Sequence, residues 1–132
     1  MNANPHQILL IDDDRDLRAM LTRALTRFGY AVVEAENGRE ALARLETATF
    51  HLVVTDIIMP DMEGIELILK LHRTNPGLPV IAMSAGGRIG PDSYLSLAKR
   101  SGAVHTLVKP FGIEEFIAAV KAVLDRAASP GS

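Results

Sequence analysis

The stretch QILLIDDDRD, Gln7–Asp16, sets a short apolar run directly against three consecutive aspartates. The run Ile8–Ile11 has the composition of a strand that is buried on both faces of a sheet. Asp12, Asp13 and Asp14 follow at once. Two carboxylates about 5 Å apart repel each other by roughly 3 kcal/mol at an effective dielectric near 20. This acidic cluster therefore destabilises the fold unless a cation offsets the repulsion.

Short apolar runs alternate with longer segments of helical spacing, five times over. Three of the runs are continuously apolar, which is typical of strands covered on both faces in a parallel sheet. Two runs, AVVEA from Ala31 and VHTLV from Val104, have polar residues in their interior, so we expect them at the edges of the sheet. The others are QILLI from Gln7, LVVT from Leu52 and PVIAM from Pro79.

Helical stripes fill the segments between these runs. Leu17, Leu21, Leu25 and Phe28 fall on one helical face, and Gly29 follows as a natural stop. Asn37 is expected to cap a second helix over residues 38–47, and Ile65, Ile68 and His72 lie along a third. Pro91 opens a fourth helix, which Gly102 closes. The last helix carries on one face Ile113, Phe116, Ile117, Val120 and Leu124.

The alternation predicts an α/β fold of the (βα)5 type, a doubly wound three-layer sandwich around a five-stranded parallel sheet. We expect one domain over residues 7–127, an amino-terminal tail at 1–6, and a carboxyl-terminal tail or linker at 128–132. In such a fold the ligand site lies at the carboxyl ends of the strands.

Composition narrows the class of protein. The chain contains no cysteine, which excludes disulfides and thiolate metal sites. The amino terminus lacks the basic segment of a signal peptide, and the first apolar run is too short to span a membrane. The net charge of -2, with Lys and Arg scattered, offers no basic surface for nucleic acid or for a membrane. We therefore expect a cytoplasmic protein, monomeric or weakly dimeric, that binds a protein or a small ligand.

Polar and charged side chains follow the predicted strands at their carboxyl ends. Asp12 and Asp13 follow the first strand, Asp56 the third, Ser84 the fourth and Lys109 the fifth. These ends meet at one edge of a doubly wound sheet. An oxygen-only cluster of aspartates favours a hard cation, and Mg²⁺ in particular holds few protein carboxylates while it accepts phosphate oxygens. The sequence therefore predicts a magnesium site at this edge.

A phosphoryl group is the ligand that suits this site. A bound divalent cation reverses the local charge, and the Lys109 ammonium and the Ser84 hydroxyl can then donate to phosphoryl oxygens. An aspartate can itself be the nucleophile and form an acyl phosphate. Asp56 is the best candidate because it ends the predicted central strand, between the acidic pair and the two donors. Asp14 is expected to cap the following helix.

Four motifs occur in the order and spacing of a known family. They are ILLIDDD, which ends at Asp14, VVTDIIMPDMEG around Asp56, VIAMSA around Ser84, and LVKPF around Lys109. With these motifs the chain resembles the receiver domains of bacterial two-component response regulators, the CheY-like family, from its first strand to its last helix. The resemblance implies the flavodoxin-like strand order 2-1-3-4-5.

The resemblance implies that Asp56 accepts a phosphoryl group from the phosphohistidine of a sensor histidine kinase or a histidine phosphotransfer protein. It also implies that Asp13, Asp56 and the backbone carbonyl of Ile58 are direct Mg²⁺ ligands, and that Asp12 acts through water and charge. Phosphorylation would change the contacts with a downstream protein target. The chain would not be an enzyme beyond its own phosphorylation and dephosphorylation. It would be a single-domain response regulator or a receiver from a longer chain.

The same resemblance assigns one phosphoryl oxygen each to Ser84 and Lys109. The peptide bond from Lys109 to Pro110 is expected to be cis, a geometry essentially restricted to X-Pro bonds. The chain departs from the family at Thr106, where typical receivers carry a Tyr or Phe ring that moves inward when the hydroxyl residue closes on the phosphate. A threonine cannot fill a pocket of that size, so the usual ring switch is not expected.

The second departure is the segment SAGGRIGPDSY, which makes the spacing between Ser84 and Lys109 longer than is common in the family. Three glycines and a proline favour alternative backbone states there. We hypothesise that the loop at residues 85–92 is the moving element in place of the ring. Its candidate switch residues are Gly86, Gly87 and Arg88.

Two alternative functions stay open. A haloacid-dehalogenase-like phosphatase would use Asp12 as its nucleophile, because Asp12-x-Asp14 after an apolar strand, with Ser84 and Lys109 later, resembles three of that family's motifs. Against it, Arg15 opens a helix at once, where that family has an inserted flap. The other alternative is an interaction module that keeps the fold without phosphorylation, and the intact acidic set argues against it.

Overall fold

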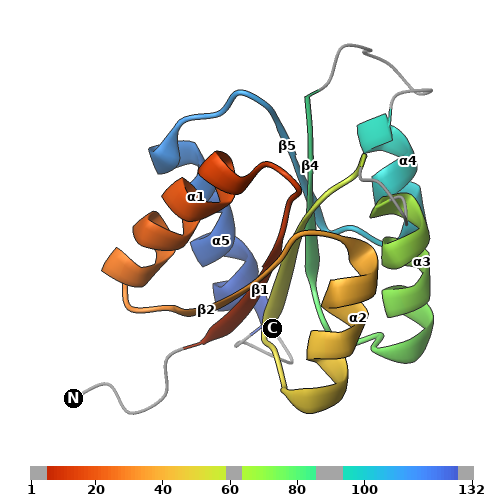
Figure 1. The fold of residues 1–132 in the computed structure, drawn as a ribbon. Helices are drawn as coiled ribbons and strands as arrows, with labels where there is room; N and C mark the ends of the chain where they lie inside the picture. The colour runs from red at the N-terminus through yellow and green to blue at the C-terminus, as the bar shows by residue number, and fades with distance from the viewer. Residues whose placement is uncertain (1–5, 59–63, 86–93, 128–132) are drawn as a thin grey trace.

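The structure is a computed structural model that describes residues 6–58, 64–85 and 94–127. Strands and helices alternate along the chain, as the sequence predicts (Figure 1). The elements are β1 (Gln7–Ile11), α1 (Arg15–Arg27), β2 (Ala31–Ala35), α2 (Gly38–Thr47), β3 (Leu52–Asp56), α3 (Gly64–Thr74), β4 (Val80–Ser84), α4 (Tyr94–Ser101), β5 (His105–Val108) and α5 (Ile113–Ala127).

Several predicted features lie outside the described residues. They are the tail at 1–5, the tail at 128–132, Pro91 at the expected start of the fourth helix, and the loop residues Gly86, Gly87 and Arg88.

The five strands form one parallel sheet in the order β2-β1-β3-β4-β5. The predicted fold class and strand order are therefore confirmed, and the two runs that contain polar residues do lie at the edges. Figure 1 shows α1 and α5 on one face of the sheet and α2, α3 and α4 on the other. β3 is the central strand, so whatever ends it lies in the middle of the carboxyl edge.

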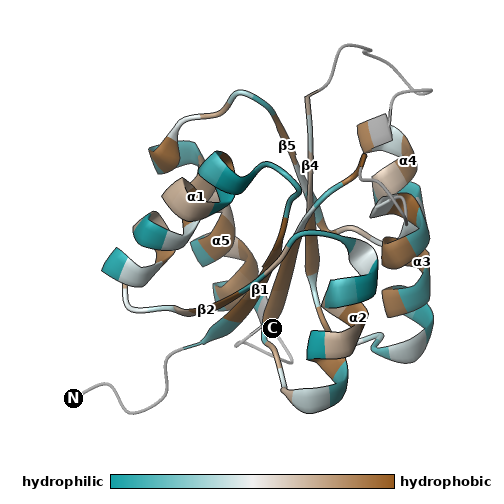
Figure 2. Cartoon of the chain, viewed as in Figure 1, coloured by the Kyte–Doolittle hydropathy of each residue, from teal (hydrophilic) through white to brown (hydrophobic). Residues whose placement is uncertain are grey.

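The apolar run of β1 serves both faces of the sheet. Ile8 and Leu10 belong to the core cluster with residues of α1 and α5, whereas Leu9 and Ile11 belong to the cluster with residues of α2 and α3. All four side chains are fully buried. The strands accordingly form the apolar layer between the helices in Figure 2. A strand buried on both faces cannot alternate in polarity, which is why its sequence is apolar throughout.

Helix α1 begins and ends largely as the sequence predicts. Asp14 caps it by accepting from the Leu17 N–H at 3.1 Å, and Leu21 and Leu25 are buried. The helical stripe was expected to include Phe28, but the helix ends at Arg27 and Phe28 is 51% exposed. The chain turns through Gly29, whose φ of 90° is in the left-handed region. The periodicity therefore stops before it reaches Phe28.

Other boundaries differ from the prediction by a residue or two. The run expected from Pro79 forms a strand from Val80 to Ser84, so Ser84 itself belongs to β4. Likewise Asp56 is the last residue of β3. Both polar side chains are thereby fixed in the sheet instead of lying in the loops that follow it. In the described parts of the chain, no helix is long and apolar enough to cross a membrane.

Candidate functional site

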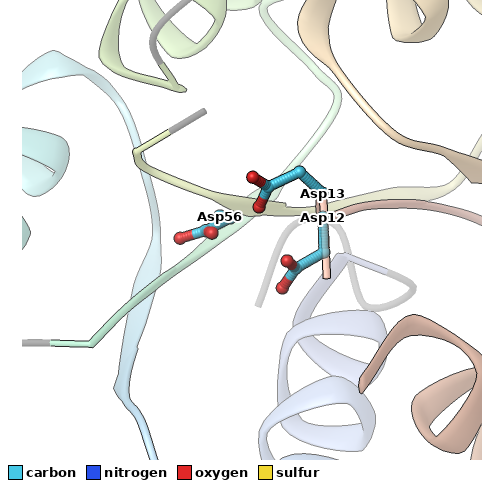
Figure 3. Close-up of side chains that lie close together, drawn as sticks. All are labelled: Asp12, Asp13 and Asp56. Carbon is cyan, nitrogen blue, oxygen red and sulfur yellow. The ribbon is translucent and has the colours of Figure 1, made fainter. Parts of the chain in front are cut away.

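The parallel strands bring the predicted site residues to one edge of the sheet. Asp12 and Asp13 follow β1 directly, and Asp56 ends β3, the neighbouring strand. One carboxylate oxygen from each of these aspartates lies within 4.8 Å of the others. Figure 3 shows the three side chains close together. The clustering expected from the strand ends is therefore present.

The acidic cluster is buried to different degrees. Asp12 is 0% exposed and Asp56 is 7% exposed, whereas Asp13 is exposed. Ser84 at the end of β4 is also buried, at 1% exposure. Buried carboxylates need a cation or hydrogen-bond donors to remain charged. The site thus has a deep part, Asp12 and Asp56, and an open part at Asp13.

Lys109 supplies the cation for the deep part. Its Nζ donates to Asp12 Oδ2 at 2.8 Å and lies 3.4 Å from Asp56 Oδ2. The other oxygen of Asp12 accepts from the Asp14 N–H at 2.9 Å. Both oxygens of Asp12 are therefore bound to groups of this chain.

The surroundings of Asp56 have opposing effects on its pKa. Burial raises the pKa of Asp56, the negative charge of Asp12 raises it further, and Lys109 offsets part of both effects. Burial acts to lower the pKa of Lys109, but the hydrogen bond and charge of Asp12, with those of Asp56, outweigh burial and raise that pKa. Lys109 is thus firmly cationic, while Asp56 is a carboxylate whose negative charge is disfavoured until further positive charge arrives.

Glycine at position 64 lets α3 begin against the backbone of the site. A Cβ on Gly64 would clash with the Asp56 carbonyl oxygen and with the backbone of Ile57. The Gly64 N–H donates to the Ile57 carbonyl. The Asp56 carbonyl also accepts from the Thr55 hydroxyl at 2.9 Å. The backbone that carries Asp56 is therefore held from both sides.

The remaining predicted residues lie at this edge, except for Thr106, which lies within β5 opposite Ala82. Lys109 N–H donates to the Ser84 carbonyl at 2.7 Å, which ties the residue after β5 to the end of β4. The Lys109–Pro110 peptide bond is cis. Thr106 is half-buried in β5, and Ile58 is half exposed just beyond β3. The roles expected for these residues stay predictions.

The sequence reasoning missed two residues beside the site. Arg18 of α1 donates through Nη1 to the Asp12 carbonyl at 2.6 Å and through Nε to Glu34 of β2 at 2.8 Å. The one available signal is that Glu34 is the single charged residue within the apolar run AVVEA. A lone acid in a half-buried strand calls for a cationic partner.

The donor set defines the chemistry that the site can perform. Carboxylate oxygens on one side suit a hard divalent cation such as Mg²⁺, and an ammonium on the other side suits an anion. An anion that also binds the cation, with a carboxylate nucleophile between them, fits phosphoryl transfer to Asp56.

Comparison with known proteins identifies the family of this chain. The model of the response regulator receiver domain matches residues 8–121, most of the chain. This chain belongs to the receiver-domain family of response regulators. The receiver assignment made from the four motifs is therefore confirmed, and the chain is a receiver domain of two-component signalling, a phosphoacceptor family. The family match, with α1 starting at Arg15, argues against the phosphatase alternative.

Individual relatives cover most of the receiver domain. The response regulator receiver protein CpdR of Brucella abortus (strain 2308) is 37% identical over 89% of this chain and 96% of its own length. The transcriptional regulatory protein GlrR of Escherichia coli (strain K12) is 36% identical over 97% of this chain but only 28% of its own length. The chain thus spans about a quarter of that regulator and almost all of CpdR.

Solved structures share the fold. The CheY-like receiver domain protein from Methanospirillum hungatei JF-1 superposes with a TM-score of 0.88 at 30% identity, over 97% of this chain and 100% of that chain. The response regulator TrrA of Thermotoga maritima, solved in complex with Mg²⁺ and BeF, has a TM-score of 0.79 at 30% identity, over 89% of this chain and 98% of that chain.

Proposed function

We propose that Asp56 is the phosphoacceptor, and that it takes a phosphoryl group from the phosphohistidine of a sensor histidine kinase or a histidine phosphotransfer protein in a Mg²⁺-dependent reaction. One observation carries the proposal. Asp56 ends the central strand with the Asp12 and Asp13 carboxylates within 4.8 Å and the Lys109 ammonium 3.4 Å away. A nucleophile is thus set between a cation site and a cationic side chain, which suits phosphoryl transfer.

The oxygen donors of the cluster fit Mg²⁺, which keeps several waters and binds few carboxylates. Asp13, Asp56 and the Ile58 carbonyl would hold the ion, and Asp12 would act through water and charge. The Mg²⁺ and BeF complex of TrrA, a protein of the same fold, supports this assignment. When bound, the ion supplies positive charge to the phosphoryl oxygens.

In the transfer step an Asp56 oxygen attacks the phosphorus, the bond from phosphorus to the imidazole nitrogen breaks, and an acyl phosphate forms. Lys109 would hold one phosphoryl oxygen, and the buried Ser84 hydroxyl would hold another. The raised pKa of Asp56 fits a Mg²⁺-dependent reaction, because positive charge from the cation would stabilise the negative charge of this buried carboxylate.

The wider function follows from the same assignment. The signalling unit would be residues 7–127 between two tails, cytoplasmic, and monomeric or weakly dimeric. Phosphorylation would alter the contacts with a downstream protein, with no nucleic acid or membrane partner and no catalysis beyond self-phosphorylation and self-dephosphorylation. Movement at Thr106 and at Gly86, Gly87 and Arg88 would carry the signal.

Incubation with acetyl phosphate and Mg²⁺, followed by intact-protein mass, tests the proposal. The wild-type chain should gain one phosphoryl group. Asp56→Asn should gain none, and neither should the wild type in EDTA. Asp16→Asn, which alters an exposed aspartate on α1, is the matched control and should be labelled like the wild type. A wild-type chain that stays unlabelled where a known receiver is labelled would overturn the proposal in favour of the interaction module. Labelling that survives in Asp56→Asn but is lost in Asp12→Asn would favour the phosphatase-like nucleophile.

A further inference from the structure

Arg18 on α1 connects three parts of the fold beside the acidic cluster. Its Nη1 donates to the Asp12 carbonyl at 2.6 Å, and its Nε donates to one Glu34 oxygen at 2.8 Å. Thr22, one turn further along α1, donates its hydroxyl to the other Glu34 oxygen at 3.0 Å. Only 15% of the Arg18 side chain is exposed. A planar guanidinium that is bound through two of its nitrogens in a largely buried position has one defined orientation.

Strand β2 holds the backbone N–H of Asp12 directly and its carbonyl through Arg18. The Asp12 N–H donates to the Ala35 carbonyl at 3.1 Å. The Asp12 carbonyl is held by Arg18, which is itself bound to Glu34, the residue before Ala35. The edge strand thus fixes the backbone beyond the end of β1, at the point where the acidic residues begin.

Asp13 is the residue whose position depends on this arrangement. The Asp12 carbonyl and the Asp13 nitrogen belong to the same planar peptide unit, so the direction of that carbonyl fixes the plane from which Asp13 leaves. Asp12 has further anchors through its side chain, to Lys109 and to the Asp14 N–H. Asp13 is exposed, yet one of its carboxylate oxygens lies within 4.8 Å of those of Asp12 and Asp56.

We propose that Arg18 is a positioning residue of the cation site. By binding the Asp12 carbonyl it holds the loop in the conformation in which one carboxylate oxygen each of Asp12, Asp13 and Asp56 lies within 4.8 Å of the others. The inference rests on the proposed function, because it gives Arg18 a part in Mg²⁺ binding at that site. Glu34 and Thr22 are the anchors that keep the guanidinium in place.

The positive charge of Arg18 acts in the opposite direction to its geometry. A guanidinium repels a divalent cation nearby, and Glu34 screens that repulsion only in part. If charge were the only effect, removal of Arg18 would tighten Mg²⁺ binding. If position matters more, the same removal weakens binding. The sign of the change in Mg²⁺ affinity therefore shows whether the charge of Arg18 or its positioning of the loop has the larger effect.

The experiment titrates Mg²⁺ into the folded protein and follows backbone amide resonances to obtain a Kd for wild type, Arg18→Met, Arg18→Lys and Arg23→Met. Thermal unfolding in EDTA identifies a temperature at which all four are fully folded. Arg18→Met should raise the Kd on the order of tenfold, as expected when a group that supports a metal ligand is lost. Arg18→Lys keeps the charge but cannot bridge the Asp12 carbonyl and Glu34 as a guanidinium does, so it should also raise the Kd. Arg23 is exposed on the same helix, and Arg23→Met should match the wild type.

An Arg18→Met protein that binds Mg²⁺ as tightly as the wild type, or more tightly, overturns the positioning role. An Arg18→Lys protein with the wild-type Kd overturns it as well, because the guanidinium that bridges the Asp12 carbonyl and Glu34 would then not be needed. Either result leaves the proposed function intact as long as the wild type binds Mg²⁺ and takes up a phosphoryl group. A wild type that does neither removes the proposed function and this inference together.

Discussion

The interior of the sheet and the deep part of its carboxyl edge are both buried, yet burial has opposite effects on stability in the two regions. Within β3 alone, Val53 and Val54 are 0% exposed and are followed by Asp56, which is 7% exposed. The valines lie between two helical layers and stabilise the fold by removing apolar surface from water. Asp56 loses hydration and meets the charge of Asp12. Burial by itself therefore does not tell whether a residue stabilises the protein.

The edge keeps a destabilising arrangement because, as we propose, the same arrangement binds the cation. Asp12 is fully buried and needs Lys109, and Lys109 lies between two carboxylates. A bound cation would relieve the remaining repulsion between the carboxylates. This repulsion therefore favours the binding of Mg²⁺. If this contrast is correct, substitutions in the interior should lower stability whatever the conditions, and substitutions at the edge should depend on charge, pH and metal.

The largest loss is expected from Phe116→Ala in the interior. Phe116 is fully buried in the cluster between the sheet and helices α1 and α5, and its ring stacks on Phe111 at 5.7 Å. Removing the ring leaves a cavity, so the free energy of unfolding should fall by about 3–5 kcal/mol. Urea unfolding monitored by circular dichroism measures the change.

Phe28→Ala is the matched control for that loss. The same substitution at a half-exposed ring, over which the Lys121 ammonium lies 4.6 Å from the centroid, should cost at most about 1 kcal/mol. Equal losses at the two positions would mean that burial in the interior is not the source of stability.

At the edge, Lys109→Met should give the next largest loss, about 3 kcal/mol at neutral pH without Mg²⁺. The substitution leaves Asp12 charged, buried and without the ammonium that now lies 2.8 Å away. The value is at the lower end for a buried pair because 18% of the Lys109 side chain is exposed. The same urea unfolding measures it.

Two comparisons check the cause of that loss. Lys70→Met, at an exposed position on α3, should leave the stability nearly unchanged. Asp12→Asn combined with Lys109→Met should recover most of the loss, because the unpaired charge is gone. A double variant as unstable as Lys109→Met alone would show that the unpaired charge of Asp12 is not the cause of the loss.

The sequence predicted the strands and the residues that end them, because these signals are local. An apolar run that stops at aspartate, a capping Asp14 and a glycine after the first helix can each be recognised within a few residues. Phe28 shows the limit, since a stripe of apolar residues does not reveal where the helix ends. Phe28 continues the stripe in the sequence but lies one residue beyond the end of α1.

The interactions that assemble the site are not local and escaped prediction. Lys109 and Asp12 are 97 residues apart, and Arg18 and Glu34 are 16 apart on different elements. Family motifs identify Lys109, because its position among them is fixed. No motif identified Arg18, whose contact with Glu34 depends on the pairing of β1 with β2. The chemistry of the edge could be predicted, but not the groups that hold it.

The smallest effect is expected from Asp56→Asn, and it has the opposite sign to the losses above. Burial, followed by the charge of Asp12, raises the pKa of Asp56. The folded state therefore binds the proton more tightly than the unfolded chain does. The stability that this carboxyl contributes is highest below its unfolded pKa and falls as the pH rises through its folded pKa. At neutral pH in EDTA, asparagine removes that penalty, and the free energy of unfolding should rise.

Urea unfolding of Asp56→Asn and wild type, from below the unfolded pKa of Asp56 up to neutral pH, measures the difference between their free energies of unfolding. This difference should close as the pH falls, because Asp56 becomes protonated in the wild type. Glu46→Gln, at an exposed position on α2, should follow the wild type at every pH. With Mg²⁺ above its Kd the order should reverse, since cation binding stabilises the protein with the complete cluster by RT ln(1 + [L]/Kd). A wild type already as stable as Asp56→Asn at neutral pH in EDTA would show that Lys109 fully offsets the buried charge, and the interior and the edge would then differ in chemistry but not in their effect on stability.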